Sequence, residues 1–283
     1  MFRKNIQPPT PESDQPLAAS ADRHLLYQHS VQDVEAEIDF IEQTWSELRA
    51  RPAVFLREDF CGTANTACEW VKRDDEHHAV GVDLDLDVLN WGRAHNLASL
   101  DPEQFERIEL LHEDVVHTRP GLVDIILAMN FSYYLFLDRD SLREYFAAAL
   151  DGLVSDGILF LDAYGGFEAP MVLKEPRECE DEDGNEFTYI WEQAAFNPID
   201  SCMTCNIHFE FPDKSRMNKA FSYHWRLWTL PEIREILYEA GFSQVDIYWE
   251  GTDEDKNEGN GIYTPSETGD ADPGWVCYIV AQP

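Results

Sequence analysis

Long apolar runs and basic residues are both scarce in this sequence. No run approaches the roughly 20 apolar residues needed to cross a bilayer, and no apolar segment of a secretory signal follows the start. We therefore expect a cytoplasmic protein with no membrane partner. Lys and Arg number 21 against 55 Asp and Glu, a formal charge of -34. A field of that sign repels phosphate backbones, so we expect no nucleic-acid partner.

Two explanations of the negative charge stay open. Dense carboxylates keep a surface hydrated in a salty cytosol, and we favour this interpretation. A preference for cationic ligands is the alternative, because a negative field attracts cations to the protein surface.

Cysteine pairs that could complete a metal site are also missing. Without an export signal, the six cysteines are expected to be reduced thiols. Cys202 and Cys205 form a single C-x-x-C pair, but a structural zinc site needs a second pair of ligands and none stands nearby. We therefore expect no metal site and interpret the pair as part of a β-strand.

Enough apolar residues remain for a packed core, since 44% of the chain is hydrophobic and 12% is aromatic. In the first half, short apolar runs alternate with segments of helical spacing. This pattern is typical of a parallel sheet whose strands are joined by right-handed helical crossovers. The predicted strands are 54–56, 79–83, 108–111, 123–128 and 157–161, and the predicted helices are 31–48, 65–72, 87–97 and 139–150.

The second half has a different pattern, of extended segments separated by turns. A helix there is opened by Thr229 and closed by Gly241. The predicted antiparallel strands are 187–191, 203–211, 220–227, 245–249 and 275–280. We predict a flexible, proline-containing tail over 1–20 and a single domain over 21–283, in which 164–228 forms a lid insert and 252–274 an acidic loop.

A glycine-containing turn after the first predicted strand carries the clearest functional signal. It reads Glu58-Asp59-Phe60-Cys61-Gly62-Thr63-Ala64, and glycine there lets backbone N–H groups approach a ligand beside a helix N-terminus. The second strand ends at Asp83, where a carboxylate can hold the two hydroxyls of a ribose. Asp114 follows the third strand, placed to meet an adenine, and Asn130 ends the fourth.

Taken together, these positions resemble the class I S-adenosylmethionine-dependent methyltransferases, whose first motif commonly runs acid-x-Gly-x-Gly-x-Gly. Aligned on Gly62, the acid is Glu58, and Phe60 and Ala64 occupy the outer glycine positions. The resemblance covers 53–162 and implies an α/β, Rossmann-like methyltransferase fold: a seven-stranded, mostly parallel sheet with helices on both faces and an inserted antiparallel lid. Segments 56–64, 130–134 and 220–228 resemble a bacterial subgroup of this class, which implies no particular substrate.

The resemblance implies S-adenosyl-L-methionine as the cofactor. Asp83 would hold the ribose, Asp114 would contact the adenine amino group, and Leu84 would pack on the adenine. Glu58, with Asp59 as the alternative, would orient the methionine amino group, while Gly62 would allow close backbone approach. The other expected cofactor contacts are Tyr27, Arg57, Thr63, Val115, Asn130 and Phe131.

Methyl transfer from a sulfonium is an in-line displacement, for which a protein mainly supplies proximity, orientation and exclusion of water. A general base is needed only if the nucleophile carries a proton at neutral pH, and His224 and Tyr133 are the candidates, with Tyr134 as an alternative to the latter. Arg226 is predicted on the same strand face as His224, where it could clamp a substrate carboxylate. An ordinary amphipathic strand, with both side chains in water, is the alternative.

We therefore predict an enzyme that moves the methyl group of S-adenosyl-L-methionine to a nitrogen or oxygen nucleophile of a small molecule. The alternative is a protein that binds S-adenosylmethionine or S-adenosylhomocysteine without transferring a methyl group, in a regulatory or assembly role. A dinucleotide-dependent oxidoreductase is disfavoured because G-x-G-x-x-G is missing. The expected partner is the small-molecule substrate, and a homodimer formed through the lid strands stays open.

Overall fold

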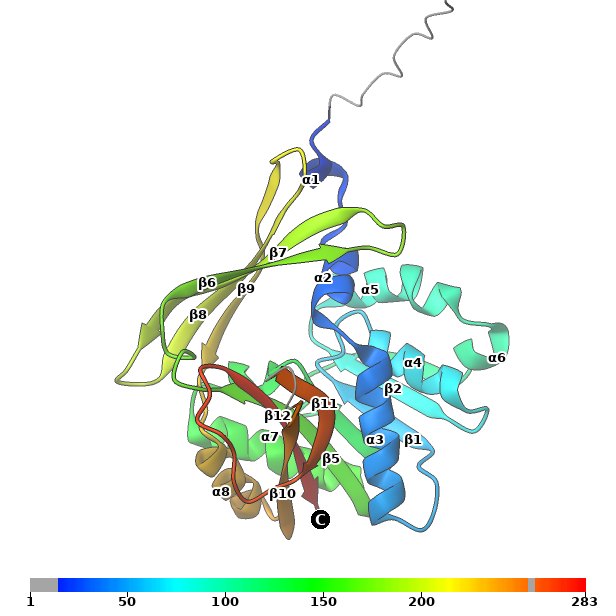
Figure 1. The fold of residues 1–283 in the computed structure, drawn as a ribbon. Helices are drawn as coiled ribbons and strands as arrows, with labels where there is room; N and C mark the ends of the chain where they lie inside the picture. Colours follow the sequence, from blue (N-terminus) through cyan, green and yellow to red (C-terminus); the bar gives the residue numbers. More distant parts are fainter. Residues whose placement is uncertain (1–14, 254–257) are drawn as a thin grey trace, which may run out of the picture.

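An eight-stranded sheet forms the centre of the molecule (Figure 1) in the computed structural model, which describes residues 15–253 and 258–283. Its strand order is β11-β10-β12-β5-β4-β1-β2-β3. Strands β1 to β5 run parallel to one another. The other three are antiparallel to their neighbours: β12 pairs with β5, β10 with β12, and β11 with β10. The bounds are β1 Phe55–Asp59, β2 His78–Asp83, β3 Ile108–His112, β4 Val123–Ala128, β5 Leu153–Gly165, β10 Gln244–Asp253, β11 Glu258–Pro265 and β12 Trp275–Gln282.

The sheet has eight strands, one more than predicted. The prediction of a continuous loop over 252–274 is also wrong. Strand β11 lies inside that range and pairs with β10. Its sequence, EGNGIYTP, is polar and contains two glycines, so it lacks the apolar alternation from which a strand is predicted. Residues 254–257 of the range lie outside the described residues.

Helices cover both faces of the sheet, as predicted. Along β4, Ile126 and Ala128 pack toward α7 and α8, whereas Ile125 and Leu127 pack toward α3 and α4, as the alternation of side chains along a strand requires. Every residue of β4 is buried. The bounds are α1 Leu17–Ser20, α2 Arg23–Val31, α3 Val34–Leu48, α4 Asn65–Arg73, α5 Leu86–His95, α6 Pro102–Phe105, α7 Arg139–Gly152 and α8 Leu230–Ala240, with 3-10 turns η1 Leu97–Ser99 and η2 Ser132–Leu135. Among the described residues no helix is long and apolar enough to span a bilayer.

The segment before β1 differs from the prediction. Residues 1–14 of the predicted tail lie outside the described residues, but Leu17–Ser20 forms the short helix α1. The Leu17 N–H donates to the carboxylate of Asp213 at 2.9 Å. The predicted helix 31–48 begins at Val34, because Asp33 caps it by accepting from the Ala36 N–H. Helix α2, which precedes it, was not predicted, and its apolar periodicity is weak.

A second sheet of four antiparallel strands arches over the carboxyl ends of the central strands (Figure 1). It consists of β6 Leu173–Glu180, β7 Glu186–Asn197, β8 Cys202–Glu210 and β9 Arg216–Arg226. Cys202 and Cys205 lie within β8, as expected. Strand β6 was not predicted, because its sequence LKEPRECE is polar and mostly exposed.

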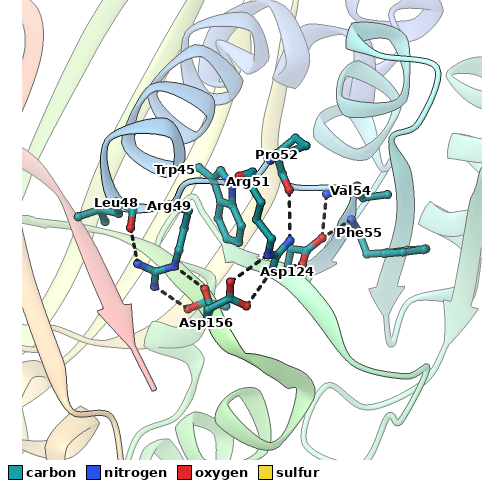
Figure 2. A network of polar contacts seen from close by, with 10 residues as sticks. Trp45, Leu48, Arg49, Arg51, Pro52, Val54, Phe55, Asp124 and Asp156 are labelled. Atoms are coloured by element: carbon teal, nitrogen blue, oxygen red, sulfur yellow. Dashed lines mark hydrogen bonds and ion pairs between the residues drawn. The ribbon is translucent and has the colours of Figure 1, made fainter.

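A polar network ties the amino ends of β1, β4 and β5 together (Figure 2). The Asp124 carboxylate accepts from the backbone N–H groups of Val54 and Phe55 at 2.8 and 2.9 Å. Arg51 bridges Asp124 and Asp156 with contacts of 2.7 and 2.8 Å. These contacts hold the amino ends of the three strands in register. The opposite, carboxyl ends of the strands lie at the candidate site.

Candidate functional site

A cavity of about 800 Å³ opens at the carboxyl ends of β1 to β4, beneath β9. Open α/β sheets bind ligands at this edge. Ten of the residues proposed from the sequence line this cavity: Tyr27, Glu58, Gly62, Thr63, Asp83, Leu84, Asp114, Val115, Asn130 and His224.

The turn after β1 has the backbone that a glycine-rich loop would adopt, although only one of its three expected glycines is present. Phe60, Gly62 and Ala64 have φ values of 57°, 52° and 57°, in the left-handed region that favours glycine. A Cβ at Gly62 would meet no protein atom within 4 Å. The turn therefore presents Gly62 to open space, where a ligand can approach the backbone.

Asp83, at the end of β2, is joined to this turn. One of its carboxylate oxygens accepts from the Gly62 N–H at 2.8 Å, and the other accepts from the Asp85 N–H at 2.8 Å. Burial raises the pKa of Asp83. Each carboxylate oxygen has a second acceptor position, so the carboxylate can also bind two hydroxyl groups of a ligand.

The neighbouring wall of the cavity is apolar with an acidic rim. The Leu84 side chain is 66% exposed although it lines the cavity, which leaves an apolar surface for a flat ligand to cover. Val115 is buried beside it. The Asp114 side chain is 45% exposed and accepts from the Val116 N–H at 2.9 Å, so it is held at the mouth of the cavity.

Glu58 supplies a buried carboxylate at the floor of the cavity. Its Oε2 accepts from the Ala67 N–H at 2.8 Å and so caps helix α4, whose own N-cap Ala64 has no side-chain acceptor. Burial, together with the nearby Asp83, raises the pKa of Glu58 to about 8. Burial also raises the pKa of Glu37 to about 8, with Asp162 and Glu58 contributing. A cation entering here would be stabilised by carboxylates that otherwise hold their protons.

A second left-handed turn follows β4. Asn130 and Phe131 have φ values of 57° and 56°, and the Asp162 carboxylate holds this turn by accepting from their backbone N–H groups at 2.7 and 2.8 Å. Asn130 lines the first cavity, whereas Phe131 points into a second one. Phe131 is therefore removed from the expected cofactor contacts.

The second cavity, of about 700 Å³, lies between the four-stranded sheet and the ends of β5, β10 and β12. It shares Tyr27, Asn130, Tyr223 and Trp225 with the first cavity. The Tyr223 and Trp225 rings stack with centroids 4.4 Å apart. These four residues mark the junction where a group held in one cavity can meet a molecule held in the other.

Arg57 was expected to contact the cofactor, but the structure places it elsewhere. Its guanidinium is 1% exposed and pairs with the Asp59 carboxylate at 2.9 Å, beneath the cavity. Tyr145 of α7 donates to the same carboxylate at 3.0 Å. Arg57 faces away because Glu58, the next residue, points toward the ligand side. Asp59, the alternative to Glu58, also lines the first cavity, but its carboxylate is engaged by Arg57 and Tyr145.

Two of the three expected catalytic side chains lie outside both cavities. Tyr133 is fully buried, and its hydroxyl donates to the backbone carbonyl of Asp162 at 2.7 Å; Tyr134, its alternative, is also fully buried. Arg226 pairs with Glu232 at 2.9 Å and stacks on Trp228. It cannot clamp a substrate in this arrangement, because Glu232 at the start of α8 already takes its charge.

Other lining residues were missed from the sequence. His24 and Lys219 line the first cavity, while Glu168 and Glu250 line the second. His24 comes from α2 and Lys219 from β9, two elements with no strand-end motif. No spacing signal links residues so far apart in the chain, and only the docking of the four-stranded sheet brings them together.

Comparisons with known proteins identify the fold. No protein-family model and no curated protein matches the chain. Among solved structures, an S-adenosylmethionine-dependent methyltransferase from Clostridium acetobutylicum is 17% identical with a TM-score of 0.64, over 91% of this chain and 96% of that one. CalS10, an amino pentose methyltransferase from Micromonospora echinaspora, is 15% identical with a TM-score of 0.64, over 92% and 96%. The sugar N-methyltransferase KedS8 from a Streptoalloteichus species is 14% identical with a TM-score of 0.63, over the full length of both chains. The protein therefore has the fold of S-adenosylmethionine-dependent methyltransferases.

Proposed function

We propose that the protein transfers the methyl group of S-adenosyl-L-methionine to a nitrogen or oxygen of a small molecule. The observation that carries the proposal is the pair of joined cavities, one with the features of a nucleoside site and one large enough for a separate acceptor. The similarly folded proteins described as sugar and amino pentose methyltransferases support a small-molecule acceptor.

The residues of the first cavity fit the proposed cofactor. Asp83 would hold the ribose hydroxyls, and Leu84 and Val115 would cover the adenine. Gly62 would allow the backbone to lie against the ligand, since no protein atom fills the space beside it. Glu58 would face the methionine amino group, a cation that compensates a buried carboxylate.

When bound, S-adenosyl-L-methionine supplies an electrophilic methyl group on a sulfonium. The protein contributes orientation and exclusion of water. Tyr223 and Trp225 would enclose the reaction at the junction of the cavities, while Asp162 holds the Asn130 turn in place. His224 lines the first cavity only, so we propose no general base on the acceptor side.

Calorimetric titration with S-adenosylhomocysteine tests the cofactor site. Asp83→Ala should weaken binding about 100-fold, because two charge-assisted hydrogen bonds to the ribose are lost. The control is Asp87→Ala, an exposed carboxylate in the first turn of α5 that does not line the cavity. Wild-type affinity in Asp83→Ala would remove this residue from the ribose role.

The same protein can be tested for transfer rather than binding alone. Incubation with S-adenosyl-L-methionine and a panel of small amines and alcohols should give S-adenosylhomocysteine together with a methylated product, detected by mass spectrometry. Tight cofactor binding with no product from any acceptor would favour the alternative of a binding protein. The left-handed Phe60 preserves the backbone turn that a glycine would make, so the loss of that glycine does not by itself favour the alternative.

A further inference from the structure

All the charged side chains that line the second cavity in the described chain are acidic. Its charged side chains are Glu168, Glu175 and Glu250, and no Lys, Arg or His is found among the described residues that line it. Most of the remaining wall is aromatic or apolar. An anionic molecule would meet only repulsion here, so the lining selects against acids and phosphates.

Glu168 and Glu250 are positioned by contacts that leave them able to bind a ligand. The buried amide of Gln193 donates to the backbone carbonyls of Glu168 and Met171 at 3.0 and 2.7 Å and so fixes the turn after β5. The Glu168 carboxylate itself makes no hydrogen bond or ion pair with the part of the chain that the structure describes. Glu250 accepts from the Gly261 N–H at 2.8 Å, which leaves acceptor positions on both oxygens.

Aromatic rings form much of the wall of the same cavity. Trp191 and Trp225 have ring centroids 6.1 Å apart, and Trp225 stacks on Tyr223. Phe131 and Tyr164, which line the same cavity, have ring centroids 4.8 Å apart. Aromatic faces attract a cation within about 6 Å of the ring centroid, and the same faces bind an apolar or sugar ring.

From this lining we infer that the acceptor is an amine, which enters the second cavity as an ammonium ion and is methylated on nitrogen at the junction with the first cavity. The inference rests on the proposed function and names its substrate class. Glu168 and Glu250 bind the charge, and the aromatic wall formed by Trp191, Tyr223 and Trp225 covers the ammonium group and its carbon skeleton.

The chemistry balances without a further reactant. The ammonium first loses one proton to water. The nitrogen lone pair then forms the N–C bond while the S–C bond of the sulfonium breaks, and the bonding electron pair stays on sulfur as a neutral thioether. The positive charge moves from sulfur to the methylated nitrogen, where the carboxylates and rings of the second cavity stabilise it.

A hydroxyl acceptor fits the second cavity less well. An alcohol needs a base to take its proton during the attack, and the basic groups that line this cavity in the described chain are carboxylates, which the inference assigns to charge binding. A neutral hydroxyl also makes no use of a cavity whose charged groups are all carboxylates.

Matched pairs of acceptors test the inference. Benzylamine and cyclohexylamine, each with the alcohol and the carboxylic acid of the same skeleton, are incubated with the enzyme and S-adenosyl-L-methionine, and products are measured by mass spectrometry. We expect methylation of the amines only. Methylation of an alcohol or an acid in preference to its amine would overturn the inference while leaving the proposed function intact. Failure of S-adenosylhomocysteine to bind would instead overturn the proposed function.

If none of the compounds in the panel is methylated, a binding measurement still tests the inference. Benzyltrimethylammonium and benzoate are titrated into the complex with S-adenosylhomocysteine. We expect the cation to bind at least about tenfold more tightly than the anion, and Glu168→Gln to weaken cation binding about tenfold. Equal affinities for the two probes would overturn the inference.

A matched control separates this effect from a general change of charge. Glu186→Gln removes a carboxylate from β7 of the four-stranded sheet, at an exposed position outside the cavity, and it should leave cation binding unchanged. Retained affinity for S-adenosylhomocysteine in both variants shows that the fold is intact. Unchanged cation binding in both Glu168→Gln and Glu250→Gln would contradict the assigned role of the carboxylates.

Discussion

At the scale of single residues, the site contains residues with strained backbone conformations and a buried acidic side chain. Phe60 and Ala64 take left-handed backbone conformations that cost a non-glycine residue about 1–2 kcal/mol each. The Phe60 ring compensates by packing on Tyr145 and Phe136, with centroids 5.4 and 6.2 Å away. Glu58 is likewise a buried carboxyl group with no basic partner among the residues that the structure describes. Such local strain and desolvation concentrate where ligands bind.

The buried carboxylates predict a pH dependence of stability in the unliganded protein. The pKa of Glu58 and of Glu37 is about 8 in the folded chain against about 4.3 when unfolded. The folded state therefore binds more protons between these values, so the free energy of unfolding should fall as pH rises through about 8. Urea unfolding at a series of pH values measures it.

Two variants test whether Glu58 causes this pH dependence of stability. Glu58→Gln should make the decline shallower, whereas Glu47→Gln, at an exposed position on α3, should not alter it. Saturating S-adenosyl-L-methionine should also reduce the decline, because its amino group compensates the ionised Glu58. A stability that rises between pH 6 and 9 would contradict the assignment, since it would require carboxylates of ordinary or lowered pKa.

At the scale of elements, the ion pair of Arg57 and Asp59 locks β1 onto α7. Both side chains are at most 1% exposed, and Tyr145 of α7 donates to Asp59. Gly152, at the end of α7, leaves the room that the guanidinium needs, because a Cβ there would lie 2.6 Å from an Arg57 nitrogen. This contact holds the strand that carries Glu58 and the Gly62 turn.

Breaking this ion pair should destabilise the protein more than it weakens cofactor binding. Arg57→Met leaves the Asp59 charge buried without its partner and should cost about 3–5 kcal/mol of unfolding free energy. The double variant Arg57→Met/Asp59→Leu should be less destabilised than the sum of the single variants. Denaturant unfolding measures the three variants, and additive losses would contradict the coupling.

At the scale of the whole molecule, two sheets create the site between them. The central sheet presents its strand ends, and the four-stranded sheet closes the space above them (Figure 1). Helix α2 and the β4–η2 turn contribute to both cavities through Tyr27 and Asn130. The two cavities therefore meet under a cover that belongs to neither sheet alone.

The net charge of -34 predicts that salt stabilises the protein. Carboxylates repel one another more strongly in the compact state, and added salt screens this repulsion. Raising NaCl from about 0.05 to 0.5 M should raise the unfolding free energy by about 1 kcal/mol or more, which corresponds to at least about 2 °C in Tm. Urea is the suitable denaturant because it is uncharged. A midpoint that stays constant or falls with salt would show that the repulsion is negligible.

The sequence by itself determined the central sheet and the cofactor side of the site. The predicted strand 123–128 matches β4 at both ends, because a strand buried on both faces must be apolar throughout. Gly62, Asp83 and Asp114 follow successive parallel strands, and parallel strands place their carboxyl ends at one edge of the sheet. The helix from Leu230 is also predictable, since Thr229, Glu232 and Gly241 form its end caps locally.

Only the tertiary structure decided which residues line the second cavity and where the proposed catalytic residues lie. Glu168 follows β5 and Glu250 lies on β10, and the two come together only because β12 pairs with both strands, so no local sequence pattern predicts them. Arg226 shares a strand with His224, yet it binds Glu232 at the start of α8. Tyr133 is buried under the Asp162 carbonyl. Side-chain periodicity predicts which way a strand residue faces, but the partner that it meets there depends on which elements pack against the strand.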